Sequence, residues 1–171
     1  MRVALGKSCT FLRGYDQNTM PCIRRGLVLS LRREVYRGNR RDEPAVAACI
    51  DGGRVVGRIN ADDAVQYNLL LRDLPPSNIE ANAVIYRITK DSHRKRNGSK
   101  YEFTRVDIRV EYTAEEGVSH RAFLTLRTLA CLHGVPFRPG KSIVQRGIHA
   151  DYVDGHNPPE DVELQGGTGQ V

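Results

Sequence analysis

Two short stretches carry the side chains best suited to binding a polyanion. The first, YRGNRRD at residues 36–42, sets a tyrosine and three arginines beside an asparagine and an aspartate. Tyrosine can stack on a nucleobase, and the arginine fork can donate two hydrogen bonds to a phosphate. Asparagine and aspartate can hold a turn, or accept a hydrogen bond from a sugar hydroxyl. The residues that we assign to a nucleic-acid site in this stretch are Tyr36, Arg37, Asn39, Arg40, Arg41 and Asp42.

The second stretch, KDSHRKRNGSK at residues 90–100, lies between two expected strands. Its like charges favour an extended, solvated hairpin tip. Such a tip can reach phosphates, because phosphate contacts depend mainly on positive charge. The alternative is a solvated loop that binds nothing. The residues that we assign to the nucleic-acid site here are Lys90, His93, Arg94, Lys95, Arg96 and Lys100.

Other chemistry lacks the motifs that it requires. The run Pro139-Gly140-Lys141-Ser142 is similar to a phosphate-binding P-loop, but that pattern needs a glycine at the position of Val135. The tightest metal-ligand group, Cys131-Leu132-His133, is not joined by a second close pair, since His149 and His156 lie apart. The serines, cysteines and histidines stand in no catalytic motif. We therefore expect no catalytic residue, no metal and no cofactor, and a protein that is not an enzyme.

The charge is divided unevenly along the chain. The net charge is +6, yet residues 151–171 hold five acidic side chains and no Lys or Arg, so residues 1–150 carry 26 basic and 15 acidic groups, a balance of +11. A basic body with an acidic tail indicates a polyanionic partner for the body. The tail could compete with nucleic acid for the basic surface, or residues 138–171 could contact protein subunits of a larger complex.

Apolar alternation predicts mainly strands. We expect strands over residues 27–36, 45–50, 54–59, 83–89 and 101–112. In the last of these, Tyr101 and Phe103 share one parity, whereas the apolar residues from Val106 to Tyr112 share the other. A strand that changes its buried face usually contains a bulge or a sharp bend, which suits a small closed barrel.

Two helices are expected. The first begins after Asn60, a favourable N-cap, and ends near Asp73. Its expected buried stripe is Ala64, Val65, Leu69 and Leu70. The second covers residues 119–133 and stops at Gly134 and Pro136. Its expected buried stripe is Ala122, Phe123, Leu126, Leu129 and Ala130.

These elements predict a mostly β fold. We expect a small bent β-barrel of the OB or SH3-like kind with one packed helix over residues 1–112. A helical extension follows over residues 113–137, and an extended acidic tail over residues 138–171.

The sequence also bears on the compartment. No apolar run is long enough to span a membrane, and the start of the chain has no apolar signal region, so we expect no membrane partner. The four cysteines are scattered without C-x-x-C spacing, which indicates reduced thiols. We expect an intracellular protein, cytoplasmic or nuclear, or, for a viral protein, one in the virion or the infected cell.

The segment from Arg33 to Asp73 resembles the HIRAN family, whose domains occur fused to chromatin-remodelling helicases and as small stand-alone proteins. The matching residues are Arg33-Glu34, Asn39-x-x-Asp42-x-x-Ala45-Val46, Gly53, Val56-Gly57, Ile59, Ala64 and Leu69-Leu70, with Arg13-Gly14-Tyr15 as a loose counterpart of an early aromatic pair. The resemblance implies a small bent barrel with a packed helix, and binding of single-stranded DNA, in some members with capture of a free 3′ end. It also implies that Asn39 and Asp42 lie at the terminal nucleotide, with Arg41 stacking or pairing with a phosphate.

The function that we expect is therefore a non-enzymatic nucleic-acid-binding module for single-stranded DNA or RNA, with a DNA 3′ end as a specific ligand. The alternative is a structural subunit of a larger assembly, such as a capsid, a phage particle or a ribonucleoprotein. A binding module should stay monomeric or dimeric, whereas a structural subunit should self-assemble or sit in a large complex.

Overall fold

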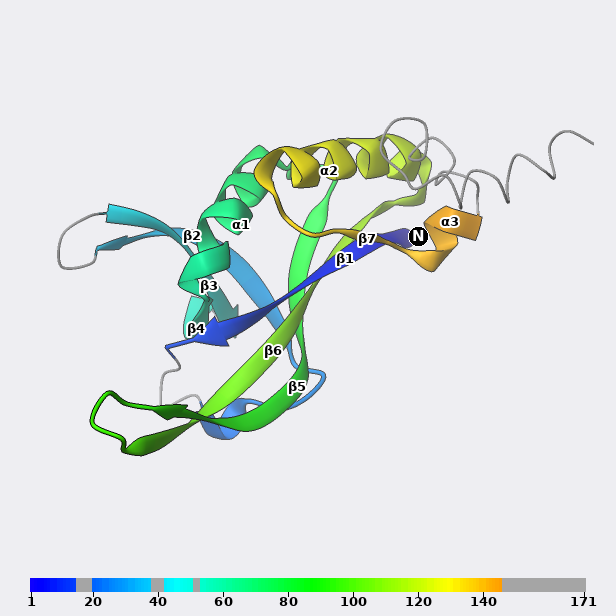
Figure 1. Ribbon diagram of the computed structural model, residues 1–171. Helices are drawn as coiled ribbons and strands as arrows, with labels where there is room; N and C mark the ends of the chain where they lie inside the picture. The colour runs from blue at the N-terminus through cyan, green and yellow to red at the C-terminus, as the bar shows by residue number, and fades with distance from the viewer. Residues whose placement is uncertain (15–19, 38–41, 51–52, 146–171) are drawn as a thin grey trace, which may run out of the picture.

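The computed structural model describes residues 1–14, 20–37, 42–50 and 53–145 (Figure 1). Its strands are β1 (Arg2–Arg13), β2 (Val28–Arg37), β3 (Asp42–Ile50), β4 (Arg54–Ile59), β5 (Glu80–Arg94), β6 (Lys100–Glu115) and β7 (Arg138–Pro139). Its helices are η1 (Met20–Cys22), α1 (Ala61–Asp73), η3 (Glu116–Val118), α2 (Ser119–His133) and α3 (Lys141–Gln145).

The strands close into a small, uneven barrel. They pair in the order β4-β3-β2-β5-β6-β1, and the antiparallel pairs Leu12–Ile59 and Arg13–Arg58 join β1 back to β4. Strand β7 extends the edge of β1 beside Gly6 and Lys7. The predicted fold class, a mostly β protein with a small bent barrel and a packed helix, is confirmed.

The irregularity expected near residues 101–112 is present, but the shift in register lies on the partner strand. Strand β6 buries three consecutive residues, Val106 to Ile108, where its buried face changes. Opposite them, the pairing of β5 slips between Ile85 and Arg87. The two strands can therefore continue beyond the barrel as a twisted hairpin, which we call the β5–β6 arm (residues 87–105; Figure 1).

Strand β1 is an element that the sequence analysis did not predict. Its inward positions include two polar residues, Ser8 and Thr10, which interrupt the apolar alternation. Both are hydrogen-bonded: the Ser8 hydroxyl lies 2.9 Å from the Tyr112 hydroxyl, and the Thr10 hydroxyl donates to Asp63 at 2.7 Å. Because satisfied polar groups can be buried at little cost, a strand can form here without an apolar pattern.

Helix α1 starts as predicted, but its buried stripe is rotated. The Asn60 side chain accepts a hydrogen bond from the Asp62 amide, as an N-cap should. The buried residues are Ala64, Tyr67, Asn68 and Leu70, whereas the predicted Val65 is exposed and Leu69 is only half-buried. Asn68 replaces an apolar residue because its amide bonds to the carbonyls of Glu34 and Ala45, at 3.2 and 2.7 Å.

Helix α2 confirms its predicted range and packs across the barrel beside α1 (Figure 1). Of its predicted stripe, four residues are buried and Leu129 is partly buried. Gly134 ends the helix at φ 69°, in the left-handed conformation that glycine adopts without strain. His133 lies 2.6 Å from Asp73 at the end of α1, and Arg72 and His133 together lower the pKa of Asp73 to about 2.

Among the described residues, no helix has the length and hydropathy needed to cross a lipid bilayer.

The segment after α2 returns to β1. The Phe137 ring lies 6.0 Å from both the Tyr112 and Phe123 rings. A Cβ on Gly6 would overlap this ring, which shows how closely the segment approaches β1. The sequence analysis assigned everything from residue 138 onward to an extended tail, yet residues 138–145 form β7 and α3 against β1. Residues 146–171 lie outside the described residues.

Candidate nucleic-acid interface

The outer face of strands β1, β5 and β6 carries aromatic and basic side chains. Side chains alternate across a strand, so the outward residues Arg105, Asp107 and Arg109 lie between residues that face the core. The register sets Arg87 of β5 and Phe11 of β1 on either side of Asp107. We call this surface the aromatic–arginine face, and its members are Phe11, Arg13, Arg87, His93, Tyr101, Phe103 and Arg105.

Phe11 lies beneath two guanidinium groups. The Cζ atom of Arg105 is 4.3 Å from the centre of the Phe11 ring, and that of Arg13 is 5.3 Å from it. A cation over an aromatic face is attracted by the quadrupole of the ring, more strongly when water is excluded. The ring and both cations are therefore held together at the C-terminal end of β1 before any ligand binds.

Aromatic rings continue outward along the arm. The Tyr101 ring lies 5.9 Å from Phe103 and 5.7 Å from His93, and the Lys95 ammonium lies 5.5 Å from the Tyr101 centre. Tyr101 is 44% exposed, although an aromatic ring of this size is usually placed in a core or an interface. These contacts place stackable rings and positive charge side by side along one surface of the arm.

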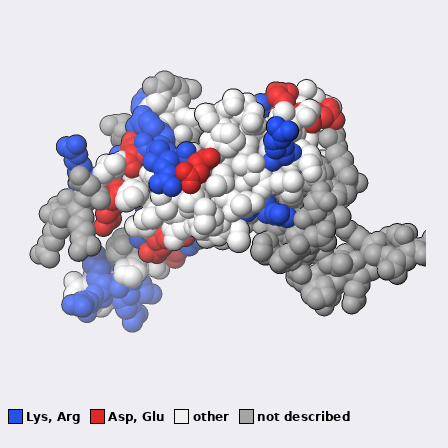
Figure 2. Space-filling view, turned by 90° about the horizontal axis from the view of Figure 1, so that it is seen from above, with Lys and Arg blue, Asp and Glu red and all other residues white. Residues whose placement is uncertain are grey.

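A hollow of about 460 Å³ opens over this face, and we call it the arm hollow. Its lining residues are Phe11, Leu12, Arg13, Gly14, His93, Tyr101, Phe103 and Arg105. From above, most of the visible Lys and Arg side chains gather at the end of the molecule from which the hairpins project (Figure 2). The positive charge and the aromatic rings therefore occur at the same end of the barrel.

Asp107 is a buried carboxylate within this face. Its side chain is 3% exposed and accepts hydrogen bonds from Arg87 Nε at 2.7 Å and from Arg105 Nε at 2.9 Å. Burial alone would raise the pKa of Asp107, but the hydrogen bonds from Arg105 and Arg87 outweigh that effect and lower it. The carboxylate is therefore ionised and fixes two guanidinium groups.

The end of β1 is anchored by the start of helix α1. The Asn60 amide N–H donates to the Phe11 carbonyl at 3.0 Å, and the Asn60 side chain donates to Thr10 Oγ1 and Asp63 Oδ2. Thr10 also donates to Asp63. These hydrogen bonds fix Phe11 and the neighbouring residues of β1 relative to helix α1.

A second hollow, of about 280 Å³, lies on the other side of the end of β1, and we call it the helix-side hollow. It shares Arg13 and Gly14 with the arm hollow. Its remaining lining residues are Glu43, Pro44, Ala45, Arg58, Ile59, Asn60, Ala61, Ala64 and Val65. The structure therefore brings the start of β3 and the β5–β6 arm to opposite sides of Arg13 and Gly14.

The structure divides the predicted basic tip between two surfaces. His93 is on the aromatic–arginine face, and Lys95 stacks on Tyr101 there. The register pairs Lys90 with Thr104 and Arg94 with Lys100, which places these three basic residues on the opposite surface of the arm. Arg96 lies in the turn between the strands, and all of these side chains are exposed.

The predicted cluster at residues 36–42 is only partly described. Arg37 is exposed at the end of β2, where the register pairs it with Asp42. Tyr36 belongs to β2 and Asp42 to β3, but their side chains lie outside the described part of the structure. Asn39, Arg40 and Arg41 lie outside it entirely.

Six members of the aromatic–arginine face were not predicted as site residues, namely Phe11, Arg13, Arg87, Tyr101, Phe103 and Arg105. One signal was present in the sequence: Tyr101 and Phe103 share a parity that the buried apolar residues of the same strand do not share. An exposed aromatic parity on a charged hairpin indicates a stacking surface. For Phe11 and Arg13 the signal was absent, because β1 itself was not predicted.

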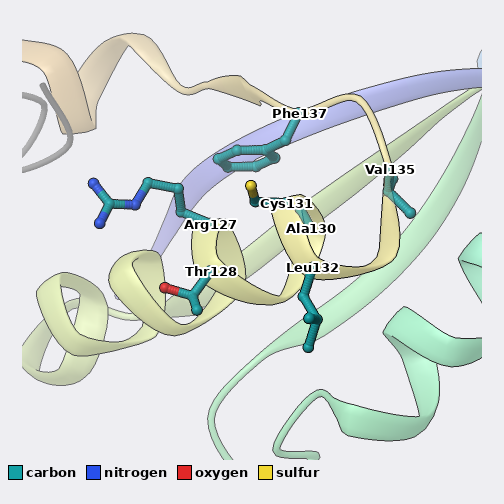
Figure 3. A pocket seen from close by; sticks show the side chains of 7 residues that line it. All are labelled: Arg127, Thr128, Ala130, Cys131, Leu132, Val135 and Phe137. Atoms are coloured by element: carbon teal, nitrogen blue, oxygen red, sulfur yellow. The ribbon is translucent and has the colours of Figure 1, made fainter. Parts of the chain in front are cut away.

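A third hollow, of about 430 Å³, lies between α2 and the segment that follows it (Figure 3). Cys131 is directed toward Phe137 there, while Leu132 points to the opposite side of the helix (Figure 3). The lining is mostly apolar, with Arg127 as its single charged residue among those described. This hollow does not combine rings with several cations as the arm hollow does.

In the described part of the chain, no group of three His, Cys, Asp or Glu side chains is placed to hold a metal ion. No protein-family model matches this sequence, and no curated protein shows significant similarity to it.

Proposed function

We propose that this protein binds single-stranded nucleic acid on the aromatic–arginine face, as a binding module without catalysis of its own. The observation that carries the proposal is the arm hollow, in which Phe11 lies under Arg13 and Arg105 while Phe103 and Tyr101 extend the row of rings. Stacking on aromatic side chains and arginine planes is the usual means of holding unpaired bases.

The physical argument favours a single strand. Each unpaired base presents an aromatic surface that can stack on Phe103 or Tyr101, whereas bases in a duplex are already stacked on one another. Basic side chains beside the rings, among them Arg13 and Lys95, can neutralise the phosphates that link the bases. Binding by such contacts tolerates many base sequences and weakens as salt is added.

A free 3′ end is the specific ligand that we propose, and its basis is the resemblance to the HIRAN family. The resemblance assigns Asn39 and Asp42 to the terminal nucleotide. Asp42 directly precedes Glu43 in the chain, and Asn39 lies a few residues before it. Glu43 lines the helix-side hollow, which meets the arm hollow at Arg13. A strand stacked along the arm would thus lead its last nucleotide toward the start of β3.

Fluorescence anisotropy with a labelled single-stranded hexadeoxynucleotide tests the stacking surface. Phe103→Ala should weaken binding about 5- to 160-fold, because stacking on one aromatic side chain contributes about 1–3 kcal/mol. The matched control is Leu132→Ala, which truncates an exposed apolar side chain on α2, and it should leave the affinity unchanged. Absence of binding by the unmodified protein at low salt would contradict the proposal and favour the assembly-subunit alternative.

The same assay tests the 3′ end. A hexanucleotide with a 3′-hydroxyl should bind more tightly than one with a 3′-phosphate, and Asp42→Ala should abolish that difference. Equal affinity for the two ends would remove the 3′-end ligand while leaving single-strand binding in place.

A further inference from the structure

A charged group on the aromatic–arginine face consists of Asp107 and two arginines, Arg87 and Arg105. This is one arginine more than the charge of Asp107 requires. One guanidinium would neutralise this carboxylate, yet two are bound to it, at 2.7 and 2.9 Å. The group therefore retains one positive charge. Its carboxylate is 3% exposed, while the two arginine side chains are 57% and 37% exposed, so the surplus charge faces the solvent.

Among the described residues, the bonding pattern leaves the outer edges of both guanidinium groups available. Each arginine donates to Asp107 through Nε. The terminal nitrogens of Arg87 and Arg105 take part in none of the hydrogen bonds found among the described residues. A guanidinium is planar and has five donors, so fixing it at Nε sets the direction of the remaining donors. Two such groups held by one carboxylate suit an oxyanion that accepts from both.

The neighbouring ring identifies the kind of oxyanion. The register places Phe11 opposite Asp107 on β1, and Arg105 lies 4.3 Å above that ring. Adjacent strands are about 4.8 Å apart, so the ring and the two arginines are within the reach of one nucleotide. A nucleotide bound beside the Arg105–Phe11 pair would have its phosphate close to Arg87 and Arg105.

We infer that Arg87 and Arg105 form a phosphate clamp for the sugar–phosphate backbone of the bound strand, with Asp107 as the residue that positions both. This inference rests on the proposed function and adds to it a phosphodiester subsite next to Phe11. Asp107 itself does not touch the ligand; it acts by fixing the two guanidinium groups.

Asp107→Asn separates positioning from overall charge. This change removes a negative charge, so a protein that attracts nucleic acid by diffuse electrostatics alone should bind more tightly. An asparagine amide can accept from only one of the two arginines and presents an N–H₂ group to the other. If the clamp exists, labelled hexathymidylate should therefore bind the full chain about tenfold more weakly after Asp107→Asn.

Arg87→Ala provides a second variant that leaves the buried carboxylate with its other partner. It should weaken binding about tenfold and reduce the slope of log affinity against log salt by about 0.7, the value for one lost phosphate contact on a single strand. The matched control is Arg109→Ala on the same outward face of β6, whose Nε donates to Glu111 at 2.7 Å. The control should change neither the affinity nor the slope.

A neutral methylphosphonate linkage moved along the hexathymidylate locates the contact. One position should weaken binding to the unmodified protein and have no further effect on Arg87→Ala. Inorganic phosphate at the same ionic strength should not compete, since the ring is part of the subsite. The clamp is overturned if Arg87→Ala has the same affinity as Arg109→Ala and Asp107→Asn binds at least as tightly as the unmodified protein. In that case, a loss of affinity in Phe103→Ala would still support the proposed function. If the unmodified protein does not bind, both are overturned.

Discussion

The arginines of the β5–β6 side and those of the β2–β4 side have different partners. Around the arm hollow, Arg13 and Arg105 lie over the ring of Phe11. On the other side of the barrel, Arg32 and Arg58 both pair with Glu34, at 2.7 and 3.0 Å. Both sides place two arginines on one carboxylate, but the arginines do not all use the same nitrogens. Arg32 donates through its terminal nitrogens to Glu34 and to the Gly53 carbonyl, whereas Arg87 and Arg105 donate to Asp107 through Nε.

The β2–β4 side uses its polar groups to join elements. Arg33 Nε donates to the Asn68 side chain at 3.1 Å, and Asn68 donates in turn to the Glu34 and Ala45 carbonyls. These bonds connect α1 to the β2–β3 hairpin. The number of arginines in a stretch therefore does not identify a binding surface, because the bonding of each arginine decides its role.

Asn68→Ala gives the largest expected effect and tests whether the β2–β4 side is structural. Asn68 is 4% exposed, and its removal leaves two carbonyls and Arg33 without this partner. Because each unsatisfied buried group costs about 1–3 kcal/mol, we expect the free energy of unfolding to fall by about 2–4 kcal/mol. Urea denaturation followed by circular dichroism measures it.

The control for Asn68→Ala is Val65→Ala on the same helix, which truncates an exposed side chain and should change stability by less than about 0.5 kcal/mol. The affinity of folded Asn68→Ala for single-stranded DNA should stay within about twofold, since the arm does not depend on Asn68. A parallel loss of affinity would break the separation between the two sides.

Much of the fold follows from local patterns, whereas the site depends on pairing. The Asn60 cap and the Gly134 stop are short-range features, and the helices that they bound formed as predicted. Strand β1 was missed because Ser8 and Thr10 face inward, and their acceptability depends on Tyr112 and Asp63, which are distant in sequence. A short segment of sequence around Ser8 and Thr10 contains neither Tyr112 nor Asp63.

The aromatic–arginine face could not be read from one stretch, because three strands assemble it. Phe11 and Arg105 meet only through the pairing of β1 with β6, and Arg87 meets Asp107 only through that of β5 with β6. The stretch that resembles the HIRAN family contains Val56, Ala64 and Leu70, all of them buried. At these positions the pattern describes packing of the barrel and helix, which a sequence can show, rather than contacts with a ligand.

Glu34→Gln tests through pH whether charge pairing stabilises the β2–β4 side. The hydrogen bond from Arg32 lowers the pKa of Glu34, with a further contribution from Arg58. A carboxyl with a lowered folded pKa stabilises the protein above its unfolded pKa, near 4.5, and this stabilisation is lost as the pH falls through the folded pKa. We expect Glu34→Gln to lower stability at neutral pH by up to about 1 kcal/mol and to have little effect in acid.

Unfolding free energies from urea denaturation at neutral pH and in acid measure this difference. Glu111→Gln, on the β5–β6 side, is the matched control, because Glu111 pairs with one arginine and is 41% exposed. It should change stability less than Glu34→Gln does. Equal losses at both pH values would mean that Glu34 acts by packing and not by its charge.

Removal of residues 151–171 has the smallest expected effect. It tests whether the acidic tail competes with nucleic acid for the aromatic–arginine face. This segment carries five acidic residues and no Lys or Arg. If it competes with nucleic acid for the aromatic–arginine face, its deletion should tighten binding of single-stranded DNA about two- to fivefold at low salt, and less at high salt, where screening weakens the competition. Anisotropy titrations at two salt concentrations measure the change.

A charge-neutral tail separates charge from length in that experiment. The substitutions are Asp151→Asn, Asp154→Asn, Glu160→Gln, Asp161→Asn and Glu163→Gln. They should reproduce the effect of the deletion, because only the negative charge opposes the ligand. In the Arg87→Ala background the gain should shrink, since one of the cations for which the tail and the DNA compete has been removed. An unchanged affinity after deletion would mean that the tail does not compete, and the excess positive charge of the body would then be available to nucleic acid at all times.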